Sequence, residues 1–170
     1  MTILKRVAWT LVRMWIGWQW LQAGMGKVGQ PVWTGEQAGV AVAGFLKGAL
    51  AKAAGDHPEV KSWYAGFVEK IALPNAKVFS YLVAYGEVLV GIALILGALT
   101  TVAALMGALM NLNFLLAGVS SSSPVMLVAT LLILTVAAAY TRHYSVDRMV
   151  IEFVKEKVAY KAAGAQAQKA

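Results

Sequence analysis

The sequence predicts an all-α membrane protein: a bundle of four transmembrane helices, with two extra amphipathic helices in its first outer segment and an interfacial helix at the C-terminus. Two observations predict this fold class. Hydrophobic residues make up 59% of the 170 residues and charged residues only 14%, whereas a soluble domain carries about a quarter charged residues. The shortage of charge is also local, because Glu87 is the only Asp, Glu, Lys, Arg or His between Val78 and Tyr140.

Four segments are apolar enough to be candidate spans, since a spanning helix needs about 20 mostly apolar residues. They cover residues 7–26, 78–99, 101–119 and 124–140. The last three are separated by only a few residues, so neighbouring helices are expected to run antiparallel. Lys5 and Arg6 precede the first span, and Arg142 and Arg148 follow the fourth. The positive-inside rule therefore predicts that both termini lie in the cytoplasm, with the chain in a prokaryotic cell membrane.

The outer segment between the first two spans, residues 34–73, has helical patterns of its own. Thr34 and Gln37 form a capping box that predicts one helix, which Gly55 ends. A second apolar stripe with helical spacing follows and stops before Pro74. The two predicted helices either cover the outer ends of the bundle or roof a binding site.

The C-terminal segment also has an amphipathic pattern. Residues 145–158 predict a cytoplasmic interfacial helix whose apolar face lies on lipid and whose basic residues attract anionic head groups. Residues 159–170 are rich in Ala, Gln and Lys and are predicted to form a flexible tail. Residues 1–158 are therefore expected to form a single membrane domain.

Polar side chains inside the predicted spans are the first candidates for function. A charged group in hydrocarbon costs about 2.5–3.5 kcal/mol, so such groups tend to face the bundle interior and mark a site. At about 1.5 Å per residue, Glu87 and Asn111 fall near the membrane midplane, and Arg13 lies on the cytoplasmic side of it. An Arg13–Glu87 ion pair would either fix helix packing only or take part in handling protons or ligand. Asn111 and Asn113 point about 200° apart, so only one of them is expected to share a cavity with Glu87.

Tryptophans in the first span lie deeper than an interfacial belt. Trp18 and Gln22 share one helix face, and Trp20 and Lys27 share another with Arg13. A flat aromatic wall beside glutamines would suit a quinone-sized ring, and it would equally suit ordinary packing. Both interpretations stay open.

Composition also excludes several kinds of chemistry. The chain has no cysteine, which removes disulfides, thiol redox chemistry, Cys-ligated zinc and ordinary iron–sulfur clusters. His57 and His143 lie outside the apolar segments, so neither haem nor another metal is expected in the bundle. The net charge of +7 favours binding to anionic lipid head groups and to an anionic substrate. Because the basic residues lie at segment ends rather than on one aromatic-rich face, no nucleic-acid partner is expected.

A series of short motifs runs in order along residues 5–150. They are Arg13-x-x-x-Gly17, Gly24-x-Gly26-Lys27, His57-Pro58, Trp63-Tyr64, Tyr85-Gly86-Glu87, Gly91, Gly97, Thr100, the run from Met110 to Gly118, Ser123-Pro124 and Asp147-Arg148. In this order they resemble the DoxX/DoxD family of small four-helix membrane proteins. The long outer segment resembles the DoxD branch more than the shorter DoxX proteins.

The resemblance implies a membrane subunit of a thiosulfate:quinone oxidoreductase, which oxidises thiosulfate to tetrathionate and reduces quinone. The implied ligand is quinone, and the implied partners are the bilayer and a second small subunit or a partner redox protein. A homo-oligomer is left open. The alternative function is a non-catalytic membrane anchor or assembly module for a partner redox protein, so whether the chain is an enzyme also stays open.

Site residues follow from combining this resemblance with the buried polar groups. Glu87, Arg13 and Asn111 are the expected catalytic residues. The residues expected to contact quinone or substrate are Trp18, Trp20, Gln22, Lys27, His57 and Asn113. Thiosulfate is an anion, and Lys27, Lys61 or Arg13 would attract it.

Overall fold

The computed structural model describes residues 2–135 and 145–167, and within these ranges it is helical and has no strand. The described elements, in chain order, are α1 (Thr2–Met25), α2 (Val40–Ala51), α3 (Ser62–Phe67), the π-helical turn η1 (Val68–Ala72), α4 (Ala76–Leu96), α5 (Thr100–Leu116), α6 (Ser123–Leu134) and α8 (Val146–Ala167). The all-α prediction is therefore confirmed for this part of the chain. The end of the predicted fourth span, residues 136–140, and His143 lie outside the described residues.

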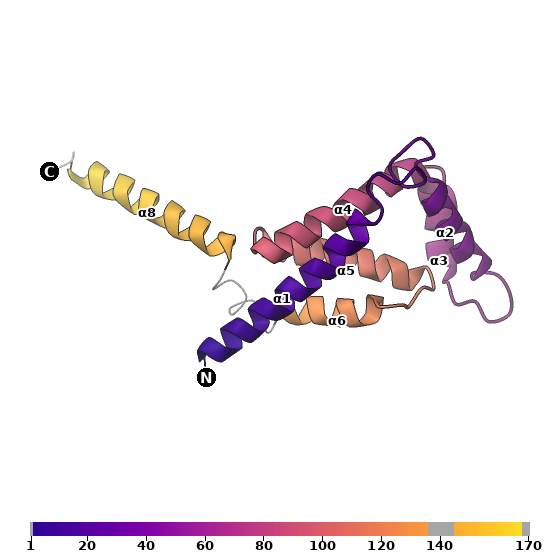
Figure 1. Ribbon diagram of the computed structural model, residues 1–170, viewed down its shortest axis with the longest axis horizontal. Coiled ribbons are helices and arrows are strands. Elements are labelled where there is room, and N and C mark those ends of the chain that lie inside the picture. Colours follow the sequence, from indigo (N-terminus) through magenta and orange to yellow (C-terminus); the bar gives the residue numbers. More distant parts are fainter. Residues whose placement is uncertain (1, 136–144, 168–170) are drawn as a thin grey trace.

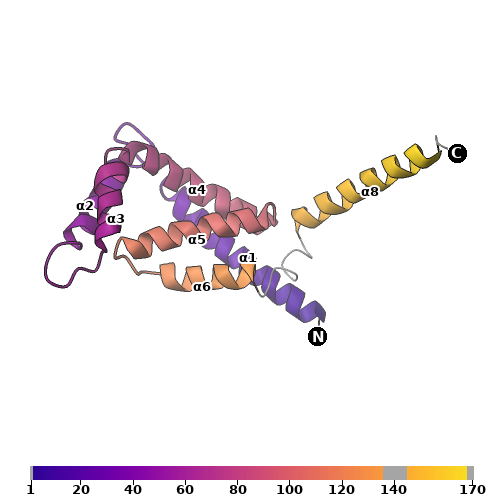
Figure 2. The same cartoon turned by 180° about the vertical axis from the view of Figure 1, so that it is seen from behind.

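Four helices form a bundle whose two ends differ. α1 packs against α4, α4 against α5, α5 against α6, and α6 returns to α1. The segment α2–α3–η1 lies across one end of this bundle, and α8 extends from the opposite end (Figures 1 and 2). We call α2, α3 and η1 the roof, the end that they cover the roofed end, and the opposite end the far end.

Glycines bring α1 and α4 into close contact. A Cβ built on Gly91 would lie 2.5 Å from the backbone nitrogen of Leu21, and one on Gly24 would lie 2.6 Å from that of Val88. Only glycine leaves room for this approach, which resembles the small-residue packing of membrane helices. Because the two helices run antiparallel, these contacts fix which residue of α1 meets which residue of α4.

Two hydrophobic clusters hold the molecule together. The bundle cluster contains Ile16, Trp20, Val90, Leu94, Ala103, Ala104, Met126 and Ile133. The second cluster lies under the roof and contains Val42, Leu46, Ala49, Val60, Tyr64, Val68, Ala72, Ala76 and Ala117. The roof therefore has its own apolar contacts with the start of α4 and the end of α5.

Length and composition single out one membrane span among the described helices. α4 has 21 residues and a mean hydropathy of 2.0 over an 18-residue window. α5 and α6 are apolar but have 17 and 12 residues, and the 24-residue α1 carries Lys5, Arg6 and Arg13. Of the four predicted spans, α4 is therefore the one that, within the described residues, is both long enough and apolar enough to cross a membrane.

The roof begins later than its sequence pattern suggests. Residues 26–39 form turns and α2 starts at Val40, so the helix start predicted at Thr34 is wrong. Thr34 Oγ1 instead accepts the backbone N–H of Gly29 at 2.8 Å. Gly39 has φ +102°, and a Cβ on it would lie 2.8 Å from the nitrogen of Lys77. The chain passes too close to the start of α4 for a helix to run through this point.

At the other end of the chain, α8 continues beyond the predicted limit. Its backbone is helical to Ala167, whereas the sequence predicts an interfacial helix that stops at residue 158 and a tail from residue 159. Alanine, which has the highest intrinsic helix propensity, dominates the extra turns, residues 159–167. The apolar stripe along this helix ends before residue 158, and a prediction based on that stripe therefore gives a helix shorter than α8.

Candidate functional site

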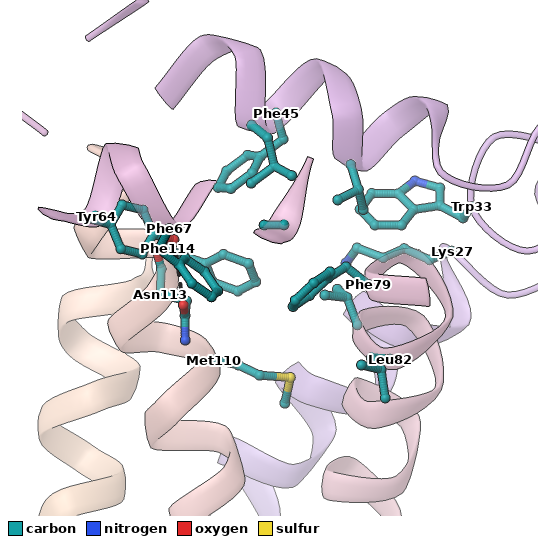
Figure 3. A pocket seen from close by; sticks show the side chains of 14 residues that line it. Lys27, Trp33, Phe45, Tyr64, Phe67, Phe79, Leu82, Met110, Asn113 and Phe114 are labelled. Atoms are coloured by element: carbon teal, nitrogen blue, oxygen red, sulfur yellow. Dashed lines mark hydrogen bonds between the residues drawn. The ribbon is translucent and has the colours of Figure 1, made fainter. Parts of the chain in front are cut away.

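A cavity of about 320 Å³ lies between the roof and the ends of α4 and α5 (Figure 3). Its walls are mainly aromatic and aliphatic. The lining residues are Lys27, Trp33, Val42, Phe45, Leu46, Tyr64, Phe67, Ala72, Phe79, Leu82, Val83, Met110, Asn113 and Phe114. Edge-to-face contacts order the rings, with centroids 6.0 Å apart for Phe45 and Phe114 and 6.4 Å apart for Phe67 and Phe79. The roof thus covers a cavity and is not merely laid on the bundle.

Hydrogen bonds join the roof and the loop before it to the bundle. The Tyr64 hydroxyl donates to the backbone oxygen of Asn113 at 3.1 Å, and Lys52 Nζ donates to the backbone oxygen of Gly118. Ser80 Oγ donates to the backbone oxygen of Trp33 at 2.6 Å. Burial raises the pKa of Tyr64, so its phenol stays protonated and remains a donor at neutral pH.

Lys27 and Glu87 form an ion pair at the edge of this cavity. Lys27 Nζ lies 2.6 Å from Glu87 Oε2, with the lysine side chain 20% exposed and the glutamate 2% exposed. Lys27 Nζ also donates to the backbone oxygen of Ala23 at 3.1 Å and lies 5.2 Å from the centre of the Trp33 ring. Lys27 lines the cavity, so the pair presents a cationic donor to the cavity while the carboxylate lies behind it.

The register of α1 on α4 explains this pairing. A Cβ on Gly24 would meet Val88 and the backbone oxygen of Ala84, so the chain just beyond Gly24 lies beside Glu87. α1 ends at Met25, and the turn that follows brings Lys27 back toward α4. Glu87 therefore pairs with Lys27 and not with Arg13.

Arg13 lies at the far end, where it belongs to a different polar cluster. Its side chain is 1% exposed, and its guanidinium fills the space beside Gly97, next to Ser145. Gly97 is ten residues from Glu87 along α4, or about 15 Å. The sequence left an Arg13–Glu87 ion pair open. In the structure the two side chains do not meet, and each belongs to a separate polar cluster.

Asp147 completes the far-end cluster by capping α5. Its carboxylate accepts the backbone N–H groups of Leu99 at 2.6 Å and Thr100 at 2.9 Å, and its own N–H donates to the Gly97 oxygen at 3.0 Å. Partial burial by itself would raise the pKa of Asp147, but hydrogen bonds from Thr100 and Leu99 and the charge of Arg13 outweigh it and lower the pKa. The cluster ties the start of α8 to the turn between α4 and α5.

The two asparagines of α5 lie on different sides of the helix, as their spacing predicts. Asn113 lines the cavity, and its Nδ2 donates to the backbone oxygen of Leu109 at 2.8 Å. Asn111 is 2% exposed, and its Nδ2 has no hydrogen-bond partner among the described residues. A Cβ on Gly86 would lie 3.7 Å from Met110 Sδ, so this stretch of α5 lies at the level of Glu87. Asn111 therefore belongs to the bundle interior, and Asn113 belongs to the cavity.

Four other residues proposed from the sequence do not reach the cavity. Trp20 is buried in the bundle cluster beside Gly107, whereas Trp18 is 52% exposed on the outer surface of α1. Gln22 and His57 are exposed, His57 in the loop between α2 and α3. The aromatic wall expected from the first span is thus built instead by Trp33 and by side chains from the roof, α4 and α5.

Some of the cavity-lining residues that were not predicted lie in patterns that are visible in the sequence. Phe45, Tyr64 and Phe67 lie on the apolar stripes of the outer segment, but a stripe shows only that a face is covered. Trp33 fits an interfacial anchor by composition alone. Phe79 and Phe114 lie inside apolar runs, where nothing in the local sequence distinguishes a cavity wall from close packing.

Among the described residues, no group of three or more His, Asp or Glu side chains lies close enough to hold a metal ion. No curated protein and no solved structure matches the chain at a significant level. The profile of the DoxX family matches residues 8–120, which is about two thirds of the sequence and includes most of α1 and all of the roof, α4 and α5. The matched segment also holds the cavity and both members of the Lys27–Glu87 pair. The chain belongs to the DoxX family, whose members are membrane proteins.

Proposed function

We propose that this protein is the membrane subunit of a quinone-linked oxidoreductase and that the quinone ring binds in the cavity under the roof. One observation carries the proposal: the Lys27–Glu87 ion pair lies at the edge of an aromatic cavity. Buried ionisable pairs beside a pocket are typical of functional sites. Membership of the DoxX family, which is often tied to quinone oxidoreductases, supports the same assignment.

The proposal includes a four-span topology with both termini in the cytoplasm. α1, α4, α5 and α6 form the bundle, and large apolar side chains such as Leu89, Leu105 and Val128 are exposed on its outer surface. An exposed apolar surface of this kind is expected to face lipid. α5, with 17 residues, is slightly short for a bilayer, and a mismatch of this size is accommodated by local thinning or by flanking residues. The end of the fourth predicted span lies outside the described residues. The roof would then lie on the outer side of the cell membrane.

The cavity fits a quinone ring in size and in chemistry. Its volume of about 320 Å³ lies within the roughly 300–1,000 Å³ range of small-molecule sites. Aromatic side chains such as Phe45 and Phe114 offer faces and edges against which a flat ring can pack. Lys27 Nζ is a charged donor, and a ring carbonyl oxygen can accept a hydrogen bond from it.

The ion pair can supply a proton during reduction. Quinone accepts two electrons and two protons when it becomes quinol. Lys27 Nζ can donate a proton to a ring oxygen that gains negative charge. Glu87 Oε2, 2.6 Å away and unprotonated in the ion pair, can then take up a proton from water and pass it to the neutral Lys27 amine, which donates the second proton. Glu87 also holds the ammonium group in position, which is a second reason for its burial.

Thiosulfate is the electron donor that the DoxD resemblance implies, and we include it in the proposal. Two thiosulfate ions give one tetrathionate and two electrons, so the balanced reaction is two thiosulfate, one quinone and two protons to one tetrathionate and one quinol. The chain has no cysteine, and electrons therefore reach the cavity directly or from a redox group in a partner subunit.

The test is to purify the protein in mild detergent, extract it for bound quinone, and assay thiosulfate-dependent quinone reduction on the same sample with membrane extract supplying partners. Glu87→Gln is expected to lower turnover about 100-fold or more, as loss of an acid–base group does. Glu69→Gln, in the exposed part of η1, is the matched control and is expected to keep full turnover. If neither quinone nor turnover is found, the proposal is wrong.

A second candidate function is an anchor or assembly module for a partner redox protein. It is favoured by α8, which exposes Met149, Phe153 and Val154 on a helix held to the bundle through Asp147. This function predicts that a partner co-purifies through α8 and that no quinone is bound. The same purification therefore separates the two candidates.

A further inference from the structure

We propose that the cavity accepts a neutral, lipid-soluble ligand that reaches it sideways from the bilayer, between α4 and α5, and that small anions are excluded from it. This inference rests on the proposed function in taking the cavity as the ligand site. It adds the class of ligand and the direction of access. It also places the oxidation of an anionic donor outside the cavity.

The first argument is the balance of charge. Lys27 is the only lining residue that is charged at neutral pH, and Glu87 neutralises it at 2.6 Å. The other lining residues are apolar or aromatic except for Asn113 and the hydroxyl of Tyr64. A dianion would have to displace Glu87 from Lys27 and lose its hydration against apolar walls, which is unfavourable. A neutral ligand with one carbonyl acceptor meets neither obstacle.

The second argument is that the roof is fixed on the side that faces water. The Tyr64–Asn113 and Lys52–Gly118 hydrogen bonds tie it to the end of α5, and Ser80 ties the loop of Trp33 to α4. Phe45 of the roof also makes an edge-to-face contact with Phe114 of α5. A ligand arriving from water would have to break several of these contacts at once.

The third argument is where the lining residues become exposed. Leu82 of α4 is 60% exposed and Asn113 of α5 is also exposed, whereas Val42, Leu46 and Tyr64 of the roof are buried. Figure 3 shows Leu82 and Met110 on the side of the cavity away from Phe45 and α2. The cavity therefore reaches the surface between α4 and α5.

That stretch of surface is apolar on both sides of the opening. Val78 and Leu89 are exposed on α4, and Leu109 and Leu112 are exposed on α5. No Asp, Glu, Lys, Arg or His other than the buried Glu87 occurs between Val78 and Leu112. A surface of this composition is matched by lipid chains, so a hydrophobic molecule dissolved in the bilayer meets the opening without crossing water.

Thiol labelling in reconstituted vesicles tests this directly, because the chain has no cysteine of its own. Val42→Cys places one thiol on a buried wall of the cavity, and Lys47→Cys places one on the exposed side of the same helix. Each is treated with a neutral benzyl methanethiosulfonate or with an anionic sulfonatoethyl methanethiosulfonate. Both reagents form a mixed disulfide with the same thiolate and release methanesulfinate, so the reactivity of the thiol cancels in the ratio of their rates.

The neutral reagent is expected to label Val42→Cys at least tenfold faster than the anionic reagent does, after normalisation to Lys47→Cys. Adding Leu82→Trp, which fills the opening, is expected to slow the neutral reagent at Val42→Cys at least tenfold and to leave Lys47→Cys unchanged. Ala72→Cys, another lining position with a small side chain, replaces Val42→Cys if that variant does not fold. Equal normalised rates for the two reagents, or no effect of Leu82→Trp, would overturn the proposal.

The outcome is separate from that of the proposed function. Labelling rates depend on access to the cavity and not on turnover. A short-chain ubiquinone that slows labelling of Val42→Cys supports the quinone assignment. If the access pattern holds but the quinone gives no protection, lateral access stands and the quinone assignment fails.

Discussion

The two ends of the bundle each hold a cation from the region of α1, but they surround it differently. At the roofed end, Lys27 pairs with Glu87 and also lines a cavity of about 320 Å³. At the far end, the Arg13 guanidinium fills the space beside Gly97, and Asp147 is occupied by the backbone N–H groups of Leu99 and Thr100.

The difference shows that burial of a charge does not by itself identify a ligand site. Burying a cation is costly, and Arg13 is buried while Lys27 is partly buried. Within the described part of the chain, Lys27 is the one of the two that lines a cavity. We therefore assign chemistry to the roofed end and a structural role to the far end, and each prediction below tests that division.

The largest expected effect is on stability at the far end. Gly97 and Gly118 both have positive φ, +69° and +72°, so alanine at either position costs about 1–2 kcal/mol in backbone strain. At Gly97 the new Cβ would also collide with the guanidinium of buried Arg13, whereas at Gly118 it would lie 2.9 Å from the Cδ of flexible Lys52. Overpacking adds about 1–3 kcal/mol, so Gly97→Ala should lower the melting temperature in detergent clearly more than Gly118→Ala. Equal shifts would contradict the packing assigned to Arg13.

The next effect is on ligand binding. Lys27→Met removes a charge-assisted donor worth about 1.5–3 kcal/mol, so the Kd for a short-chain quinone should rise about 10- to 100-fold. Arg13→Met should leave that Kd within about twofold, because Arg13 lies at the other end of α4. Binding can be measured by quenching of tryptophan fluorescence, since Trp33 lines the cavity. A loss of affinity in Arg13→Met as large as in Lys27→Met would remove the distinction between the two ends.

A smaller effect is expected from Asp147→Asn, which weakens the cap of α5. Loss of such a cap costs about 0.5–2 kcal/mol. The pKa of Asp147 is lowered in the folded state, so its stabilisation is complete above the unfolded pKa and disappears as the pH falls through the folded pKa. The gap in melting temperature between wild type and Asp147→Asn should therefore be constant near neutral pH and close only in acid. A gap that closes between pH 6 and 8 would show that another group is responsible.

The smallest effect should follow from Tyr64→Phe, which removes one hydrogen bond between the roof and Asn113. A bond of this kind contributes about 0.5–1.5 kcal/mol. Amide hydrogen exchange should quicken in the roof and stay unchanged at the start of α8. Phe67→Leu is a useful comparison, because it alters the cavity wall without touching this bond. Faster exchange at the far end in Tyr64→Phe would mean that the two ends are coupled.

Local sequence determined the helical class and identified the buried charged and amide side chains, Arg13, Glu87 and Asn111. Helix-forming apolar runs and the energetic cost of charge in hydrocarbon act over one or two turns, so Arg13, Glu87 and Asn111 could be picked out from their neighbours alone. The glycines at positions 91 and 97 were also visible, because close approach needs a residue without a side chain. DoxX membership followed from the order of short motifs, and the match over residues 8–120 confirms it.

Only the tertiary structure decided which of these residues meet. The register of α1 on α4 depends on contacts between Gly24 and Val88, and between Gly91 and Leu21, which are far apart in sequence. That register places Glu87 next to Lys27 and Arg13 next to Gly97. The cavity likewise needs side chains from the loop of Trp33, the roof, α4 and α5 at once. Sequence periodicity can show that a face is covered, but whether the covering side chains fill the space or leave a cavity depends on packing among all of these elements.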